Sequence, residues 1–179
     1  HATVKFPASI MLVAAMNPCP CGYFTDPKRE CKCSPVMIER YLSRISGPLL
    51  DRIDIHIEVP PVPWRQLRSE ADGLDSAAMR AQVVAARTVQ RTRFADGEGR
   101  PAVTTNATMS SKQVRAFCKL DAEGETLLKQ AMTEMGLSAR AHDKVLRIAR
   151  TIADLENEPD IAPHHVAEAV QYRRLDRKL

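Results

Sequence analysis

The chain has 179 residues, a formal net charge of +4 and a sequence pI near 8.9. Hydrophobic residues make up 44% and charged residues 27%, the balance of a soluble globular protein. The longest apolar run, Ile10 to Met16, is too short for a membrane helix, so we expect no membrane span and a cytoplasmic protein. A mildly basic balance permits contact with nucleic acid without requiring it. The chain begins at His1 with no initiator Met and no signal peptide, which indicates a fragment.

The first sixty residues predict two strands, a cysteine-rich loop and one helix. Residues 10–15 are a continuous apolar run, typical of a strand buried on both faces. Ser34 is a suitable N-cap for a helix over 35–46, which Gly47 and the proline after it should end. Residues 53–59 alternate apolar and polar side chains, as a strand does, and a proline-rich linker follows them.

The rest of the chain has a helical pattern. Asp121 and Ser138 are suitable N-caps, and Gly136 lies where a helix would end. The expected helices are a first one over 76–94 capped by Ser76, then 110–118, 122–135, one beginning after Ser138 and one beginning at Pro163. Residues 95–109 predict a loop. Apolar residues of the first helix form a stripe that we expect to face the core, namely Met79, Val83, Ala86, Val89 and Phe94.

Four cysteines, Cys19, Cys21, Cys31 and Cys33, lie within fifteen residues in two close pairs. Two such pairs joined by a short polar loop can bring four thiolates to one tetrahedral centre, which is what structural zinc requires. Free thiols and disulfides are the alternatives, although disulfides are rare without a secretory signal. Cys118 stands alone in a helical pattern and is expected to be an ordinary buried cysteine.

Several long stretches carry a family resemblance. The stretches AMNPCPCG, SGPLLDRID and LSARAHDKVLRIARTIADLE resemble the Mg-chelatase-like AAA+ ATPases, and within them the ComM/YifB group. The resemblance covers nearly the whole chain. It implies an α+β fragment that is mostly α: the C-terminal part of an AAA+ core in residues 1–62, with a zinc loop over 18–34, then a linker and basic helix over 63–105, and an all-α lid over 106–179.

The resemblance also assigns three roles at an ATP site. Asn17 resembles sensor 1, which positions the attacking water at the γ-phosphate. Arg52 resembles the arginine finger, supplied across a subunit interface, and Arg44 is the second candidate for it. Arg140 resembles sensor 2, a lid residue in the first turn of a helix, where the helix dipole also favours phosphate. Read without the resemblance, Asn17 is an ordinary turn residue, and Arg52 is a surface arginine paired with Asp51 or with Asp54 two residues later.

The cofactors and partners follow from the same resemblance. ATP and Mg²⁺ are expected, but no G-x-x-x-x-G-K-[ST] loop occurs in the chain, so their ligands would lie mostly upstream and the fragment alone is expected to be inactive. Members of the family form homo-hexameric rings, and the ComM group is associated with DNA branch migration during natural transformation. Arg80, Arg87 and Arg91 are spaced to share one helix face and are the candidates for contact with DNA phosphates.

Two other functions remain open from the sequence. One is a true chelatase motor that drives Mg²⁺ insertion into a porphyrin, against which the cysteine cluster argues. The other is a non-catalytic zinc and helix module that binds DNA or a partner protein. For the basic helix itself, a solvated face explains the arginines as well as DNA binding does.

Overall fold

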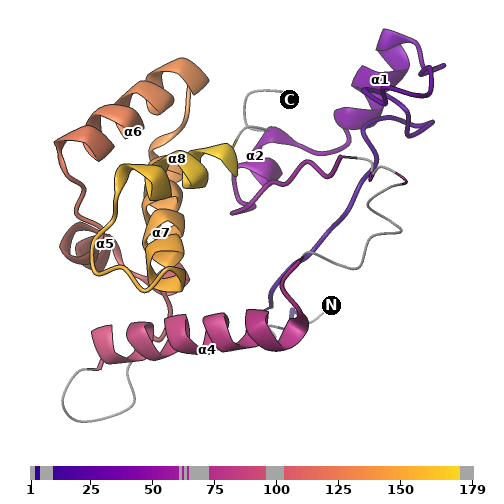
Figure 1. The fold of residues 1–179 in the computed structure, drawn as a ribbon. Coiled ribbons are helices and arrows are strands. Elements are labelled where there is room, and N and C mark those ends of the chain that lie inside the picture. The colour runs from indigo at the N-terminus through magenta and orange to yellow at the C-terminus, as the bar shows by residue number, and fades with distance from the viewer. Residues whose placement is uncertain are drawn as a thin grey trace. The chain divides into compact units, whose positions relative to one another are not determined.

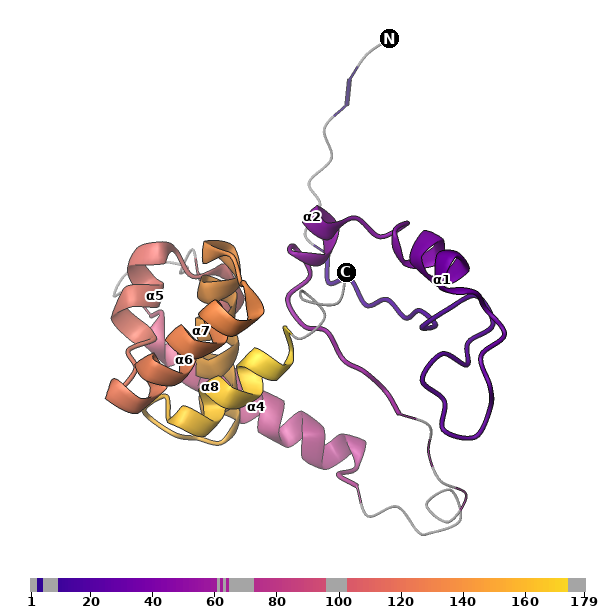
Figure 2. The ribbon, with the colours of Figure 1, turned by 90° about the horizontal axis from the view of Figure 1, so that it is seen from above.

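The computed structural model describes residues 3–4, 10–60, 62, 64, 73–95 and 103–173. It divides into two compact units, His1–Arg44 and Ile45–Leu179, each of which is described by itself below. Figure 1 and Figure 2 label the α-helices. Apart from one isolated β-bridge between Leu120 and Ile161, helices account for the secondary structure assigned in the described ranges. No helix among these residues is long and apolar enough to cross a membrane.

The first unit contains an extended segment, the cysteine loop and one helix. Residues 10–16 are extended, but they pair with no other described strand, and Ile10 and Met11 are more than four-fifths exposed. The chain then turns at Gly22, whose φ of 83° lies in the left-handed region that favours glycine. Helix α1, Pro35–Leu42, begins after Ser34, whose hydroxyl accepts a hydrogen bond from the Met37 N–H as predicted.

Two expectations for the segment that joins the units need correction. Helix α1 ends at Leu42 rather than at residue 46, and Gly47 begins a new short helix, α2, Gly47–Leu50. A proline fits the first turn of a helix, so Pro48 lies at the start of α2, whereas α1 has already ended at its C-cap Ser43. Residues 53–59 are extended without a strand assignment. Neither predicted strand is confirmed, because a strand needs a ladder of backbone hydrogen bonds to a neighbouring strand, and no strand is assigned among the described residues.

The second unit is a helical domain. It comprises α4 (Ser76–Arg93), the 3-10 helix η1 (Asn106–Thr108), α5 (Ser111–Phe117), α6 (Ala122–Met135), α7 (Ala139–Leu155) and α8 (Pro163–Gln171). The predicted caps Asp121 and Ser138 are confirmed, and Gly136 ends α6 with a φ of 61°. Helix α4 is capped by Asp75 instead of Ser76, and the loop expected over 95–109 contains η1.

Helix α7 is the centre of this domain. It packs against α4, η1, α5 and α8, and α6 packs against α8 (Figure 1). The core contains Phe94, Met109, Val114, Leu128, Val145, Ala149, Ile152, Ile161, Val166 and Ala169. Only the C-terminal half of α4 reaches this core, so the predicted apolar stripe is wrong in part: Ala86 and Phe94 are buried, but Met79 and Val83 are about half exposed.

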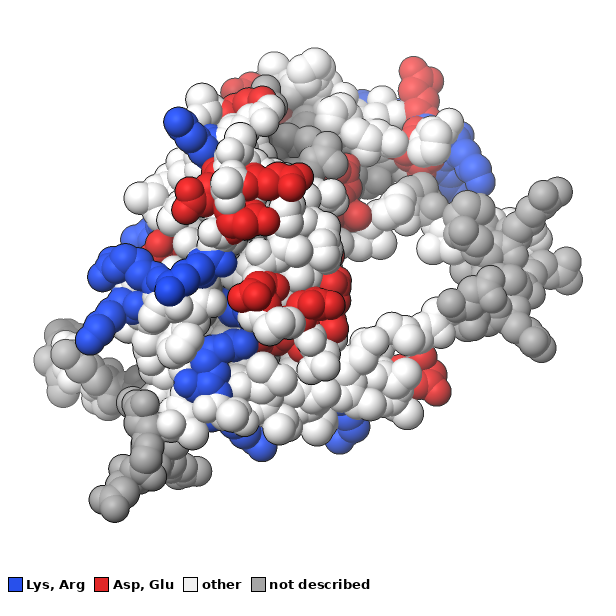
Figure 3. All heavy atoms as spheres, turned by 60° about the vertical axis from the view of Figure 1, so that its left-hand side comes forward, with Lys and Arg blue, Asp and Glu red and all other residues white. Residues whose placement is uncertain are grey.

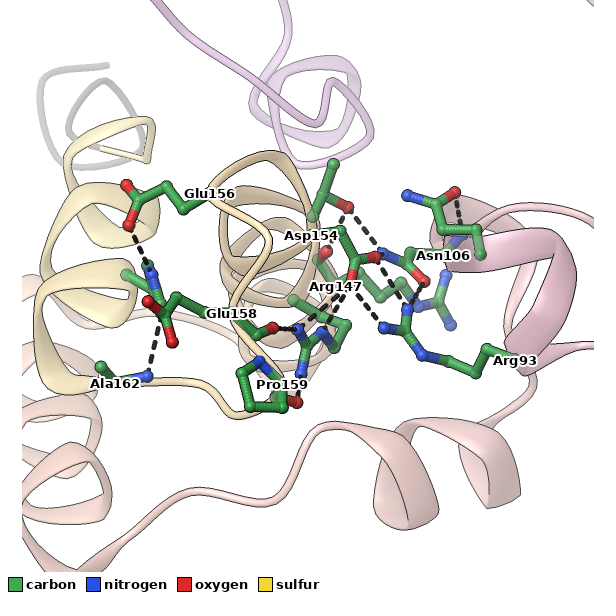
Figure 4. Close-up of polar contacts among 12 residues, drawn as sticks. Arg93, Asn106, Arg147, Asp154, Glu156, Glu158, Pro159 and Ala162 are labelled. Carbon is green, nitrogen blue, oxygen red and sulfur yellow. Dashed lines mark hydrogen bonds and ion pairs between the residues drawn. The ribbon is translucent and has the colours of Figure 1, made fainter. Parts of the chain in front are cut away.

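A buried polar cluster fastens α4 and η1 to α7. The carboxylate of Asp154 pairs with both terminal nitrogens of Arg93 and accepts from Asn106 Nδ2 at 2.8 Å and from Arg150 Nε at 3.0 Å (Figure 4). Although burial opposes it, the hydrogen bonds from Arg93 and Asn106 hold the pKa of Asp154 below its usual value. Arg93 is therefore mostly buried and paired with a carboxylate, unlike the exposed arginines of the same helix.

Candidate functional site

The cysteine loop of the first unit brings four thiols together. The sulfur of Cys19 lies 3.4 Å from that of Cys21 and 3.7 Å from that of Cys31, and all four sulfurs, including that of Cys33, lie within 4.8 Å of one another. These are too far apart for disulfides. A tetrahedron with metal–sulfur bonds of 2.3 Å has edges of about 3.8 Å. The donor set and its spacing therefore fit one tetrahedral metal ion.

The ionisation of the thiols supports the same interpretation. A hydrogen bond from the backbone N–H of Tyr23 lowers the pKa of Cys21 to about 6. Although the backbone N–H of Cys33 lowers it, burial and the neighbouring thiols raise the pKa of Cys31 to about 12. Four sulfurs this close cannot all carry negative charge without a cation among them. Cys118 is separate: it is buried in the second unit as predicted, and burial raises its pKa to about 11.

Local hydrogen bonds explain why this loop folds back on itself. The Gly22 N–H donates to the Cys19 carbonyl at 3.0 Å, and the Phe24 N–H donates to the Cys19 sulfur at 3.3 Å. The Asp26 carboxylate accepts hydrogen bonds from the backbone N–H groups of Lys28 and Arg29. Asn17, the sensor 1 candidate, precedes the loop with an exposed side chain, and a β-carbon on Gly22 would lie 3.6 Å from its amide nitrogen.

In the second unit, Arg140 is bound to the segment that carries Arg52. The Arg140 guanidinium donates to Asp51 Oδ2 at 2.8 Å, and the Ser138 hydroxyl donates to Asp51 Oδ1 at 3.0 Å. Although partial burial opposes it, the hydrogen bonds from Arg140 and Ser138 hold the pKa of Asp51 below its usual value. Asp51, directly before Arg52 in the chain, thus pairs with the sensor 2 candidate rather than with Arg52.

The segment after Asp51 is fastened to the helical domain through its backbone. Lys144 Nζ donates to the Arg52 carbonyl at 2.6 Å and pairs with the Asp54 carboxylate at 2.8 Å. Arg173 donates to the Ile53 carbonyl. The Arg52 side chain is exposed and donates to the Pro48 carbonyl at 2.8 Å, so the expected pairing of Arg52 with Asp51 or Asp54 does not occur.

The other candidate arginines are distributed between the units. Arg44, the second candidate for the finger, is exposed in the first unit, whereas Arg52 and Arg140 both belong to the second. Arg80, Arg87 and Arg91 are exposed on α4, and Figure 3 shows basic side chains at intervals along the lower edge of the view, where this helix lies. The structure thus leaves these three arginines accessible to a ligand.

The sequence suggested only Arg52 as a partner of Asp51, not Arg140 or Ser138, and it gave no sign of the cluster of Glu156, His164 and His165. Both histidines lie within 3.0 Å of one Glu156 carboxylate oxygen, and they lower the pKa of Glu156. His165 Nδ1 accepts from the Ala162 N–H, so its Nε2 carries the proton and donates to Glu156 (Figure 4). A metal bound to Nε2 would leave both ring nitrogens of His165 without a proton. We therefore interpret this cluster as structural, with Glu156 bound to the first turn of α8.

Comparison with known proteins identifies the family. Residues 1–67 match the family model "Magnesium chelatase, subunit ChlI", and residues 73–173 match "Magnesium chelatase, subunit ChlI C-terminal". The chain belongs to the magnesium chelatase ChlI family. It is 42% identical over its whole length to the competence protein ComM of Haemophilus influenzae and 39% identical to YifB of Escherichia coli. A Mycobacterium tuberculosis relative is 34% identical over 94% of the chain.

The matched proteins are longer than this chain. It covers 33% of the length of ComM and 34% of that of YifB. The family resemblance found in the sequence is therefore confirmed, together with its ComM and YifB relatives. Because the chain spans about a third of the length of these relatives, the roles of its residues are considered below as proposals.

Proposed function

We propose that this chain is the C-terminal part of an ATP-dependent AAA+ motor of the ComM type, which assembles as a hexameric ring and remodels DNA. In this proposal Asn17 is sensor 1, Arg52 is the arginine finger and Arg140 is sensor 2. The ATP and Mg²⁺ ligands lie mostly in the upstream part of the protein. Membership of the ChlI family and the similarity to a competence protein support it.

The observation that carries the proposal is that the segment of Arg52 is bound to helix α7, which carries Arg140. Lys144 of α7 donates to the Arg52 carbonyl, and Arg140 itself pairs with Asp51, so both candidate arginines lie in one unit and on adjoining segments. The family resemblance implies that Arg52 acts across a subunit interface, and a lid residue such as Arg140 would serve its own subunit if it acted in cis. The shared segment instead favours one ATP site, in the neighbouring subunit, for both.

The chemistry suits these residue types. A guanidinium keeps its charge at every physiological pH and presents a planar fork of donors to phosphate oxygens. An arginine that contacts the γ-phosphate in the transition state accelerates transfer by about 10³–10⁵ in comparable enzymes. Arg52 and Arg140 are both exposed, so neither is committed to the core of the fold.

Within this proposal the four cysteines hold a structural zinc ion. Zinc would tie the two ends of the loop together and supply no chemistry to ATP hydrolysis. Arg80, Arg87 and Arg91 would contact DNA phosphates from the exposed face of α4. A second function, ATP-driven insertion of Mg²⁺ into a porphyrin, is favoured by the names of the matching family models alone.

ATP hydrolysis by the full-length protein tests the proposal. We expect DNA to stimulate hydrolysis, and Arg52→Ala and Arg140→Ala each to remove most of the turnover while the melting temperature stays nearly unchanged. Stimulation by a porphyrin and not by DNA would favour the chelatase function. If Arg52→Ala unfolds the protein, Arg52 is structural through its bond to the Pro48 carbonyl, and Arg44 becomes the finger candidate.

A further inference from the structure

Asp51 directly precedes Arg52 in the chain and contacts Arg140. Both of its carboxylate oxygens accept hydrogen bonds from residues at the start of α7. Oδ1 accepts from the Ser138 hydroxyl and Oδ2 from the Arg140 guanidinium. The Arg140 side chain is 56% exposed and that of Asp51 is 29% exposed. Because the pair lies at the surface, an incoming anion can reach Arg140 without unfolding any element.

The bond to Asp51 is not what holds the surrounding segment in place. Lys144 donates to the Arg52 carbonyl, Arg173 donates to the Ile53 carbonyl, and the His56 N–H donates to the Tyr172 carbonyl at 2.9 Å. These bonds involve the backbone and do not depend on the Asp51 charge. The Asp51 carboxylate is thus available to act on the Arg140 side chain itself.

We propose that Asp51 is a positioning residue that competes with the γ-phosphate of ATP for Arg140. A carboxylate and a phosphate use the same guanidinium donors, so Arg140 binds one at the expense of the other. An exposed ion pair is weak, so a triphosphate of higher charge displaces Asp51, whereas ADP, which has no γ-phosphate, leaves the pair intact. Asp51 thereby lowers the affinity for ATP without affecting that for ADP. This inference rests on the proposed role of Arg140.

The test uses the full-length protein and the dissociation constants of fluorescent ATPγS and fluorescent ADP. Asp51→Asn keeps the size of the side chain but removes its charge. We expect it to tighten ATPγS binding about two- to fivefold and to leave ADP binding unchanged. Asp51→Glu, which keeps the charge, should bind both nucleotides nearly as the wild type does. The matched control is Asp54→Asn, which removes a neighbouring carboxylate that pairs with Lys144 and not with Arg140.

The outcomes separate this inference from the proposed function. In an Arg140→Ala background, Asp51→Asn should no longer change ATPγS binding, because its partner is gone. If Arg140→Ala weakens ATPγS binding but Asp51→Asn leaves the preference for ATPγS over ADP unchanged, or weakens ATPγS binding, only the role of Asp51 is overturned. If Arg140→Ala leaves ATPγS binding intact, the sensor 2 role fails and the Asp51 role fails with it. A melting temperature close to that of the wild type verifies that each variant is folded.

Discussion

Asp154→Asn should be among the most destabilising single changes in the helical domain. The Asp154 side chain is fully buried, and it is the shared ion-pair partner of Arg93 and Arg150, whose side chains are 13% and 3% exposed. Asparagine has nearly the same shape but no charge, so the two guanidiniums would remain largely buried without the carboxylate that they share. Breaking a buried ion pair from one side costs about 3–5 kcal/mol. For a chain of this size that corresponds to a fall in melting temperature of about 6–20 °C.

Thermal unfolding followed by circular dichroism measures this effect. The control is Asp160→Asn, an exposed carboxylate a short distance along the chain, which should change stability by no more than about 0.5 kcal/mol. Equal effects of the two substitutions would refute the reasoning that the cluster around Asp154 holds α4 and η1 to α7.

The cost of Asp154→Asn should also depend on pH. The folded-state pKa of Asp154 lies below its unfolded value of about 3.9. Its contribution to stability is therefore fully present above that pH and is lost as the pH falls through the folded-state pKa. The difference in stability between the wild type and Asp154→Asn should shrink in acid. A difference that stays constant down to the acid transition would mean that the charge of Asp154 is not what stabilises the domain.

The remaining predictions concern the cysteine loop and the basic helix. Elemental analysis should find one zinc per chain, and Cys21→Ser should release it, because a hydroxyl is a poor ligand for zinc; an unchanged zinc content would show that Cys21 is no ligand. Replacing Arg80, Arg87 and Arg91 together by Ala should weaken DNA binding by the full-length protein and reduce the slope of log K against log salt by up to about 2.7. An unchanged slope would assign these arginines to a solvated helix face.

Features set by a few neighbouring residues could be predicted from the sequence. Ser34, Asp121 and Ser138 cap helices because each side chain accepts a hydrogen bond from a backbone N–H three residues later. Gly136 adopts a left-handed conformation that other residues rarely reach. The four cysteines were recognised because their two pairs lie within one short loop, and the structure brings their sulfurs together.

Features that depend on distant residues could not be predicted in this way. Arg93 pairs with Asp154, which lies 61 residues later in the sequence. Nothing near Arg93 in the sequence distinguishes it from the exposed Arg91. Arg140 pairs with Asp51, which lies 89 residues earlier in the sequence. The predicted strands are not confirmed for a related reason. An alternating pattern such as 53–59 indicates which face a strand would bury but not whether a neighbouring strand is there.

Mixing subunits of the full-length protein tests most directly whether Arg52 and Arg140 serve one ATP site. Arg52→Ala subunits should be mixed with subunits whose upstream G-x-x-x-x-G-K-[ST] loop, the Walker motif, is inactivated. The mixture should regain some ATP turnover, because some interfaces then join an intact finger to an intact nucleotide pocket. Arg140→Ala mixed with the same Walker-motif variant should behave alike. Arg52→Ala mixed with Arg140→Ala should stay inactive, since no subunit then offers both arginines to its neighbour. Turnover regained in that last mixture would contradict the account and place Arg140 at the ATP site of its own subunit.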